Sequence, residues 1–209
     1  MAIRKYIGKV PIHVYDDSAS DLRSLIRMMG GVYAFLRGKI SYHELWYRLL
    51  IYKHYKEFFV GNNVYFRARV GKGEGQSDTV PPDVVFRRLK CNEHVLLKMD
   101  VEGSEYSILR DFLAYEEAID LVVVEFHDTF RYRREFEATV EEFREWYNIV
   151  HVHANNFSAL ATDGLPLVVE ITFMSKRFEV DSLFQRDLPI PGLDFPNDPT
   201  QPDIAIHFA

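Results

Sequence analysis

The sequence predicts an α/β fold with a seven-stranded, mainly parallel sheet and helices on both faces. Strand-like and helix-like segments alternate along the chain, and this alternation repeats five times, as in sheets built with helical crossovers. Several of the strand candidates are near-continuous apolar runs, which is typical of strands covered on both faces. The length of 209 residues and the apolar content of 47% suit one globular domain. We therefore expect a single domain over residues 1–209, with a proline-rich tail at 187–209 packed on it.

The first two strands are expected on either side of a short helix. "PIHVYD" (11–16) is rich in β-branched and aromatic residues, and "VYAF" (32–35) has the same character, so each indicates a strand. Between them, residues 20–29 carry apolar side chains at helical spacing. Gly30 and Gly31 follow directly and are expected to end this helix.

A longer helix and a third strand come next. Ser41 and Glu44 have the spacing of a capping box, at the start of a helix candidate that extends to Phe59. The apolar face of this helix is wide, which predicts substantial burial. "VYFRARVG" (64–71) alternates between apolar and polar residues and indicates the third strand. "PPDVVFRRL" (81–89) indicates a short helix with proline at its start.

The second half of the chain supplies four more strands with helices between them. The strand candidates are "HVLLKMD" (94–100), "DLVVVEFH" (120–127), "IVHVHANN" (149–156) and "LPLVVEITFMS" (165–175). The helix candidates are "SEYSILRDFL" (104–113) and "REFEATVEEFREWY" (134–147). The first strand of this group is expected to be buried on both faces.

Composition and charge exclude several classes of partner. The net charge of −6 gives no basic face for phosphate groups, so a nucleic acid is not expected as a partner. Cys91 is the only cysteine, which excludes an intrachain disulfide and argues against a cysteine-based zinc site. No apolar run approaches the ~20 residues of a membrane span, and the N-terminus lacks the apolar core of a signal peptide. We therefore expect a cytoplasmic protein that does not bind a membrane.

Polar side chains gather at the ends of the predicted strands. Asp16, Asp100, Glu102, Glu125 and His127 all lie at or just past a strand end. The carboxyl ends of parallel strands share one edge of the sheet, and ligands bind at that edge. This edge is therefore the predicted functional site.

The chemistry of these residues suits proton transfer. Strand alternation places Glu125 and His127 on one face, and an imidazole that titrates near neutral pH can deprotonate a hydroxyl. Carboxylates at Glu102 and Glu105 also suit the N-terminus of the helix that follows. A divalent metal on Asp100, Glu102 and His127 is compatible with these ligand types. The sequence alone does not distinguish such a metal, and we assign no metal ligand.

Two motifs resemble one family. "LLKMDVEGSEYSIL", followed by "DLVVVEFH", resembles the FkbM family of S-adenosylmethionine-dependent methyltransferases. In that family an Asp-x-Glu-Gly-x-Glu stretch leaves the fourth strand of a Rossmann-like methyltransferase sheet, and a Glu-x-His ends the fifth. "NNVYFRARVGKGEG" resembles its third strand and glycine turn, and the proline-rich ending resembles that of some members. The resemblance extends from about Val64 to the C-terminus.

The resemblance implies O-methylation of a hydroxyl on a sugar or small metabolite. S-adenosylmethionine would be the cofactor, and a small molecule or glycan the acceptor. Asp100, His127 and Glu125 would be the catalytic residues, with His127 or Asp100 as the base. Edge strands and the aromatic helix that follows Ser41 are compatible with a homodimer.

The first half of the chain departs from the family pattern. Members have a first strand ending in Asp-x-Gly-Ala-Asn-x-Gly and a second strand ending in an acid that holds the ribose. One alignment sets "VYDDSASDL" (14–22) on the first motif and "VYAFLRG" (32–38) on the second. The other makes "PIHVYDD" (11–17) the second strand, with Asp16 or Asp17 as the ribose acid and no glycine-rich strand.

The first alignment gives the cofactor contacts that we expect, which are Asp16, Ser18, Ser20, Arg37 and Glu102. In this alignment Ser18 and Leu22 replace motif glycines, and Leu36 or Arg37 replaces the ribose acid. The alternative function is therefore a degenerate methyltransferase fold that serves as a binding or assembly module without the cofactor.

Overall fold

The computed structural model describes residues 10–17, 21–59, 61–71, 78–89, 94–178 and 187–207. The chain forms two compact units, Met1–Val85 and Phe86–Ala209. Ser18 and Ser20, two of the expected cofactor contacts, lie outside the described residues.

The first unit contains two short pairs of parallel strands. β1 (His13–Tyr15) pairs with β2 (Val64–Phe66), and β3 (Arg69–Val70) pairs with β4 (Thr79–Val80). The strand predicted at 64–71 is thus divided, because the amide of Ala68 donates to the carbonyl of Phe66 and interrupts the ladder. The helix α4 (Pro82–Leu89) follows β4 and begins with proline as predicted.

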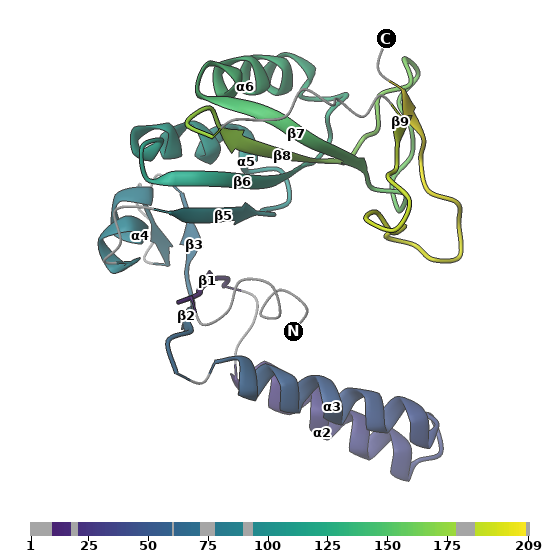
Figure 1. Cartoon of the computed structure of the whole chain (residues 1–209). Helices are drawn as coiled ribbons and strands as arrows, with labels where there is room; N and C mark the ends of the chain where they lie inside the picture. Colours follow the sequence, from purple (N-terminus) through teal and green to yellow (C-terminus); the bar gives the residue numbers. More distant parts are fainter. Residues whose placement is uncertain are drawn as a thin grey trace. The chain divides into compact units, whose positions relative to one another are not determined.

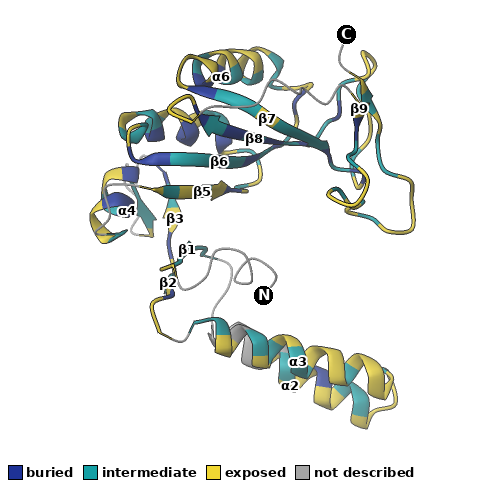
Figure 2. Ribbon diagram, in the orientation of Figure 1, coloured by how far each residue is buried: buried dark blue, intermediate teal, exposed yellow. Residues whose placement is uncertain are grey.

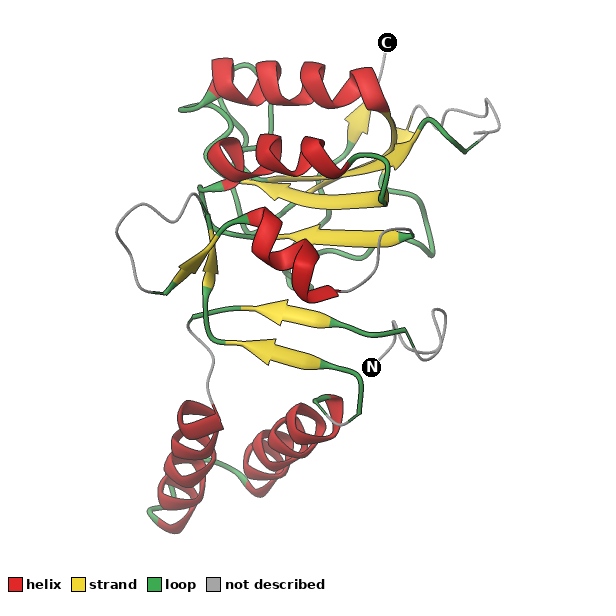
Figure 3. Cartoon of the chain, turned by 90° about the vertical axis from the view of Figure 1, so that its left-hand side faces the viewer, coloured by secondary structure: helices red, strands yellow, loops and turns green. Residues whose placement is uncertain are grey.

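Two helices, α2 (Asp21–Leu36) and α3 (Tyr42–Phe58), pack against each other in the first unit (Figure 3). The strand predicted at 32–35 is wrong, because helix α2 continues through these residues. Gly31 does not end the helix but lies buried against α3, where an added Cβ would be 2.9 Å from Cδ of Arg48. A glycine here permits the close approach of two helices, and this contact offsets its low helix propensity.

Helix α3 begins as the sequence predicts. The hydroxyl of Ser41 accepts from the amide of Glu44 at 3.2 Å, and the Glu44 carboxylate accepts from the amide of Ser41 at 2.9 Å, which confirms the capping box. The predicted burial is wrong for Tyr42, Trp46 and Tyr47, which are each more than half exposed. Much of α3 is coloured as exposed in Figure 2. No helix in the described part of the chain combines the length and the apolar character needed to cross a membrane.

The second unit is built on a four-stranded sheet with the order β5-β6-β8-β7 (Figure 1). Its strands are β5 (Val95–Met99), β6 (Ile119–Phe126), β7 (Tyr147–Ala154) and β8 (Val169–Ser175). β5 and β6 are parallel, whereas β8 lies between β6 and β7 and is antiparallel to both. The α/β class is confirmed. Within the described residues the strands form small sheets of mixed direction, and not one seven-stranded, mainly parallel sheet.

The core of the second unit lies between this sheet and three helical segments. These are α5 (Glu105–Ile108), the 3-10 helix η1 (Leu109–Tyr115) and α6 (Arg133–Trp146). Phe126 of β6, Phe173 of β8 and Phe143 of α6 are almost completely buried. Burial alternates along β5, where Leu96 is 46% exposed, so the expected burial of this strand on both faces is wrong. Such alternation is typical of a strand that is covered on one face.

The described part of the tail folds back on the second unit. β9 (Asp187–Leu188) and β10 (Ile206–His207) pair in antiparallel fashion. The buried side chain of Asn156 donates to the carbonyl of Asp198 at 3.0 Å and accepts from its amide at 2.7 Å. His151 and His153 of β7 pair with tail carboxylates, which are Asp194 at 2.8 Å and Asp203 at 3.0 Å.

Candidate functional site

A tight turn follows strand β5 and carries the DVEGSE motif. Glu102 and Gly103 are both left-handed, with φ angles of 49° and 102°. Glycine adopts this conformation without a steric cost, whereas glutamate does so rarely. The two left-handed residues reverse the chain, so that α5 begins at Glu105 and brings this side chain under the end of β6.

Glu105 and His127 form the central contact of the site. Oε1 of Glu105 lies 2.5 Å from Nδ1 of His127 and also accepts from the amide of Gly103 at 3.0 Å. Glu105 is completely buried. Among the described residues, its second oxygen, Oε2, has no hydrogen-bond partner. A buried carboxylate is costly to leave unpaired, so the imidazole is its main compensation.

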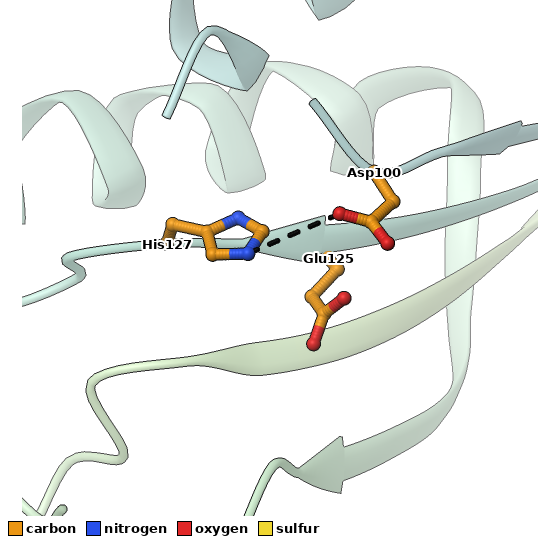
Figure 4. Close-up of side chains that lie close together, drawn as sticks. All are labelled: Asp100, Glu125 and His127. Carbon is orange, nitrogen blue, oxygen red and sulfur yellow. Dashed lines mark ion pairs between the residues drawn. The ribbon is translucent and has the colours of Figure 1, made fainter. Parts of the chain in front are cut away.

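The other side of the imidazole faces Asp100. Nε2 of His127 lies 3.9 Å from Oδ1 of Asp100, which follows the end of β5 (Figure 4). When Nδ1 donates its hydrogen to Glu105, the neutral ring carries its lone pair on Nε2. The contact with Glu105 therefore directs the basic nitrogen toward Asp100.

Glu125 lies on the same face of β6 as His127, as strand alternation predicts. Val124 and Phe126, which point the opposite way, are completely buried, whereas Glu125 and His127 are half-buried. Oε1 of Glu125 accepts from Nδ2 of Asn155 at 2.7 Å, which orients the carboxylate. The ligand atoms of Asp100, Glu125 and His127 all lie within 4.8 Å of one another (Figure 4).

The charges around His127 raise its pKa. Burial of the ring disfavours the charged imidazolium and alone would lower the pKa. The hydrogen bond with Glu105 and the negative charges of Glu105, Glu125 and Asp100 outweigh this effect, so the pKa is raised above its usual 6.5. The site is thus built to stabilise positive charge on or beside the imidazole.

Comparison with models of protein families shows the family of the chain. Residues 54–158, half of the chain, match the methyltransferase FkbM domain. The chain belongs to the FkbM methyltransferase family. In comparisons with curated proteins and with solved structures, nothing matches. The matched range of this FkbM domain includes the DVEGSE turn, Glu125 and His127, so the site lies within the part that defines the family.

S-adenosylmethionine is the general methyl donor of methyltransferases. Of the residues expected to contact this cofactor in the FkbM chain, only some have a side chain that suits it. Glu102 is exposed at the turn after β5, and Asp16 is partly buried after β1. A carboxylate can accept from a ribose hydroxyl. Arg37 does not suit the ribose role, because a guanidinium has no acceptor. It follows helix α2 and lies over the ring of Tyr33, 5.0 Å from the ring centroid.

The strand pairing in the first unit favours the second of the two alignments. In the doubly wound order 3-2-1-4-5-6 the second strand lies beside the third. β1 pairs directly with β2, the strand that resembles the third strand of the FkbM family. Residues 32–35, the second strand of the first alignment, are helical instead. The first alignment is therefore wrong at this strand, and the second alignment, with Asp16 or Asp17 as the ribose acid, remains.

Two residues of this FkbM site were not assigned from the sequence. Glu105 was interpreted only as a carboxylate at a helix N-terminus, and Asn155 had no assigned partner. The glycine of DVEGSE carries the missing signal for Glu105, because a left-handed Gly103 turns the following glutamate back toward the strand end. No local pattern pairs Asn155 with Glu125, since that contact depends on the order of the sheet, in which β8 lies between β6 and β7.

Proposed function

We propose that the chain is an S-adenosylmethionine-dependent O-methyltransferase that acts on a hydroxyl of a sugar or small metabolite. The observation that carries this proposal is the placement of His127, held at Nδ1 by the buried Glu105 and facing Asp100 with Nε2. A nucleophilic hydroxyl needs a base, and an imidazole oriented by a carboxylate is suited to that task. The family match supplies the type of reaction.

In this proposal, His127 removes the proton of the acceptor hydroxyl. Glu105 keeps Nδ1 protonated, so that Nε2 is free to take the hydroxyl proton as the new C–O bond forms. The resulting imidazolium is stabilised by Glu105 on one side and by Asp100 and Glu125 on the other. S-adenosylmethionine, when bound, supplies a methyl group on a positively charged sulfur, which leaves as a neutral thioether.

The acidic residues at the two strand ends would hold the cofactor and the acceptor. Glu102 and Asp16 are proposed as acceptors for sugar hydroxyls, each within its own unit. Parallel pairing of β1 with β2, and of β5 with β6, agrees with neighbouring strands in the doubly wound order. This agreement supports a Rossmann-like methyltransferase fold as part of the proposal. A cytoplasmic location, a small-molecule or glycan acceptor and a homodimer also belong to it.

A second candidate function is a non-catalytic binding or assembly module on the same fold. The observation that favours it is helix α2, which occupies residues 32–35, where the first alignment expects a strand of the cofactor site. The sequence also lacks the family's glycine-rich motif in both alignments.

A titration of the full chain with S-adenosylmethionine distinguishes the two functions. The methyltransferase proposal expects saturable heat by calorimetry and a melting temperature that rises with cofactor concentration. The demethylated product, S-adenosylhomocysteine, should give the same two signals. If neither compound gives heat or a shift at millimolar concentration, the non-catalytic module is correct.

The role of His127 needs a separate measurement. Transfer of a radiolabelled methyl group to a panel of hydroxylated sugars would report turnover. His127→Gln should reduce turnover by ~10²–10⁴-fold, the usual contribution of a general base, while the affinity for S-adenosylmethionine stays unchanged. Equal turnover in wild type and His127→Gln would remove His127 as the base.

A further inference from the structure

We propose that Asp100, Glu125 and His127 bind a divalent metal cation. Asp100 follows β5, and Glu125 and His127 lie at the end of β6, so two adjacent parallel strands present all three side chains. From the sequence, Asp100, Glu102 and His127 were the residues compatible with a metal. In the structure, Glu125 takes the place of Glu102 beside the imidazole. Two carboxylates and one imidazole suit Mn²⁺ and related divalent ions.

The separations are close to those that a shared ion requires. Oδ1 of Asp100 and Nε2 of His127 are 3.9 Å apart, and all three ligand atoms lie within 4.8 Å of one another. With bonds of about 2.1 Å, two ligands of one ion are about 3.0 Å apart at right angles and about 4.2 Å apart on opposite sides. The three ligand atoms are therefore somewhat too far apart as they stand and must move closer to share an ion. The Asp100 side chain is 47% exposed, so a small rotation can bring it to bonding distance.

The contact with Glu105 is an independent observation that points to a cation. In metal-binding histidines, the ring N–H that does not face the metal commonly donates a hydrogen bond to a carboxylate. This bond orients the ring and makes the other nitrogen a stronger ligand. Glu105 does this from a completely buried position, 2.5 Å from Nδ1. Its Oε2 lacks a donor among the described residues. A cation on Nε2 would compensate the buried negative charge through the ring.

A second supporting contact orients Glu125. Nδ2 of Asn155 donates to Oε1 of Glu125 at 2.7 Å, which leaves the ligand role to the other oxygen. Glu170, opposite Glu125 on β8, is paired with Lys98 at 3.0 Å. The ammonium of Lys98 is thus directed to Glu170. The cluster of Asp100, Glu125 and Glu105 therefore retains an excess of negative charge beside His127.

The role of the ion rests on the proposed function, although its binding does not. A bound divalent ion would polarise the acceptor hydroxyl and lower its pKa. His127 would then act as a ligand, and the second carboxylate oxygen of Asp100 would receive the proton. Methyl transfer would in this case require the metal.

Binding can be measured on the full chain without any assay of activity. The protein is stripped with EDTA, exchanged into metal-free buffer and titrated with MnCl₂, and free Mn²⁺ is followed by electron paramagnetic resonance. We expect one saturable site in the wild type. Asp100→Asn, Glu125→Gln and His127→Gln should each weaken it by at least tenfold, and Glu105→Gln by ~10–100-fold. Competition with MgCl₂ and ZnCl₂ would identify the preferred ion.

Glu137→Gln is the matched control for Glu125→Gln, because the same charge is removed from the exposed face of helix α6. This variant should bind Mn²⁺ as the wild type does. The metal proposal is overturned by two results. One is the absence of saturable binding at millimolar Mn²⁺. The other is equal affinity in the wild type and in ligand variants whose circular dichroism shows an intact fold.

Titration of the stripped protein with S-adenosylmethionine separates this proposal from the proposed function. Mn²⁺ binding without any response to S-adenosylmethionine would retain the metal site and remove the methyltransferase. A response to S-adenosylmethionine without Mn²⁺ binding would retain the methyltransferase, with His127 as the base, and remove the metal site.

Discussion

The carboxylate of Glu105 lies 2.5 Å from Nδ1 of His127 and is completely buried beneath the imidazole. This contact joins the two motifs that identify the family, the turn after β5 and the end of β6. It orients the ring whether Nε2 takes up a proton or binds a metal ion. Glu105 therefore acts through His127 and is a positioning residue.

Two substitutions of Glu105 should have different effects, one mainly on activity and the other on stability. Glu105→Gln keeps an acceptor for Nδ1 but removes the charge, so we expect ~10–100-fold lower activity with little loss of stability. Glu105→Ala leaves the amide of Gly103 and Nδ1 of His127 without their partner, and should cost about 1–3 kcal/mol of unfolding free energy. Urea unfolding and methyl-transfer rates of both variants would test this.

The pH profile of turnover separates a positioning role of Glu105 from a purely structural one. Loss of the carboxylate should lower the pKa of His127, so the rising limb of the profile should move to lower pH in Glu105→Gln. An unchanged profile with a lower rate would contradict the assigned role.

Most of the site could be predicted from the sequence, because strand ends in an α/β protein are easy to locate. Asp100, Glu125 and His127 lie together as strand alternation and parallel pairing require. Glu105 was missed because its position depends on two successive left-handed residues, and only one of them, Gly103, is a glycine. The residue type of Glu102 does not predict its left-handed backbone, with φ at 49°, because glutamate rarely adopts this conformation.

The fold was predicted well in the second half and poorly in the first. Strands β5 and β8 lie within their predicted ranges, whereas β6 begins at Ile119 and β7 at Tyr147, each shortly before its predicted range. Long apolar segments bounded by charged residues specify all four strands strongly. Their pairing is a long-range property, and the insertion of β8 between β6 and β7 left no local signal. At residues 30–36 the Gly-Gly pair and the β-branched Val32 suggested a turn and a strand. The contact with α3 overrode these local preferences.

The raised pKa of His127 predicts how the stability of the metal-free protein changes with pH. The folded state holds the proton more tightly than the unfolded chain does, because Glu105 and the neighbouring carboxylates outweigh the effect of burial. This contribution to stability is fully present below the unfolded pKa of about 6.5 and is lost as the pH rises through the folded pKa.

Urea unfolding between pH 5.5 and 8.5, with EDTA present, would measure this dependence. The stability difference between wild type and His127→Gln should be larger at the acid end of this range. A difference that grows toward high pH would show that the charges around the ring do not favour the imidazolium.

The buried Asn156 predicts how firmly the tail is held. Its side chain bonds to the backbone of Asp198 in both directions and also donates to the carbonyl of Pro202 at 3.3 Å. Asn156→Ala would leave these backbone groups unpaired, at a cost of about 1–3 kcal/mol. Hydrogen exchange at residues 198–203 should accelerate in this variant. Gln201→Ala, a change at an exposed position of the same segment, should alter stability by less than about 0.5 kcal/mol.

The two adjacent glycines of helix α2 give a direct test of whether residues 30–36 are helical. At Gly30 an added Cβ meets nothing within 4 Å, so Gly30→Ala should stabilise the helix by about 0.5–1 kcal/mol. At Gly31 the added Cβ would lie 2.9 Å from Cδ of Arg48, so the flexible side chain of Arg48 must move. This movement offsets part of the gain in helix propensity, and Gly31→Ala should stabilise the helix less than Gly30→Ala. Thermal unfolding and the hydrogen exchange of α2 amides would rank the two variants. A Gly-Gly turn that leads into a strand would instead be weakened by both substitutions, and that result would restore the strand at 32–35 and with it the first alignment of the cofactor motif.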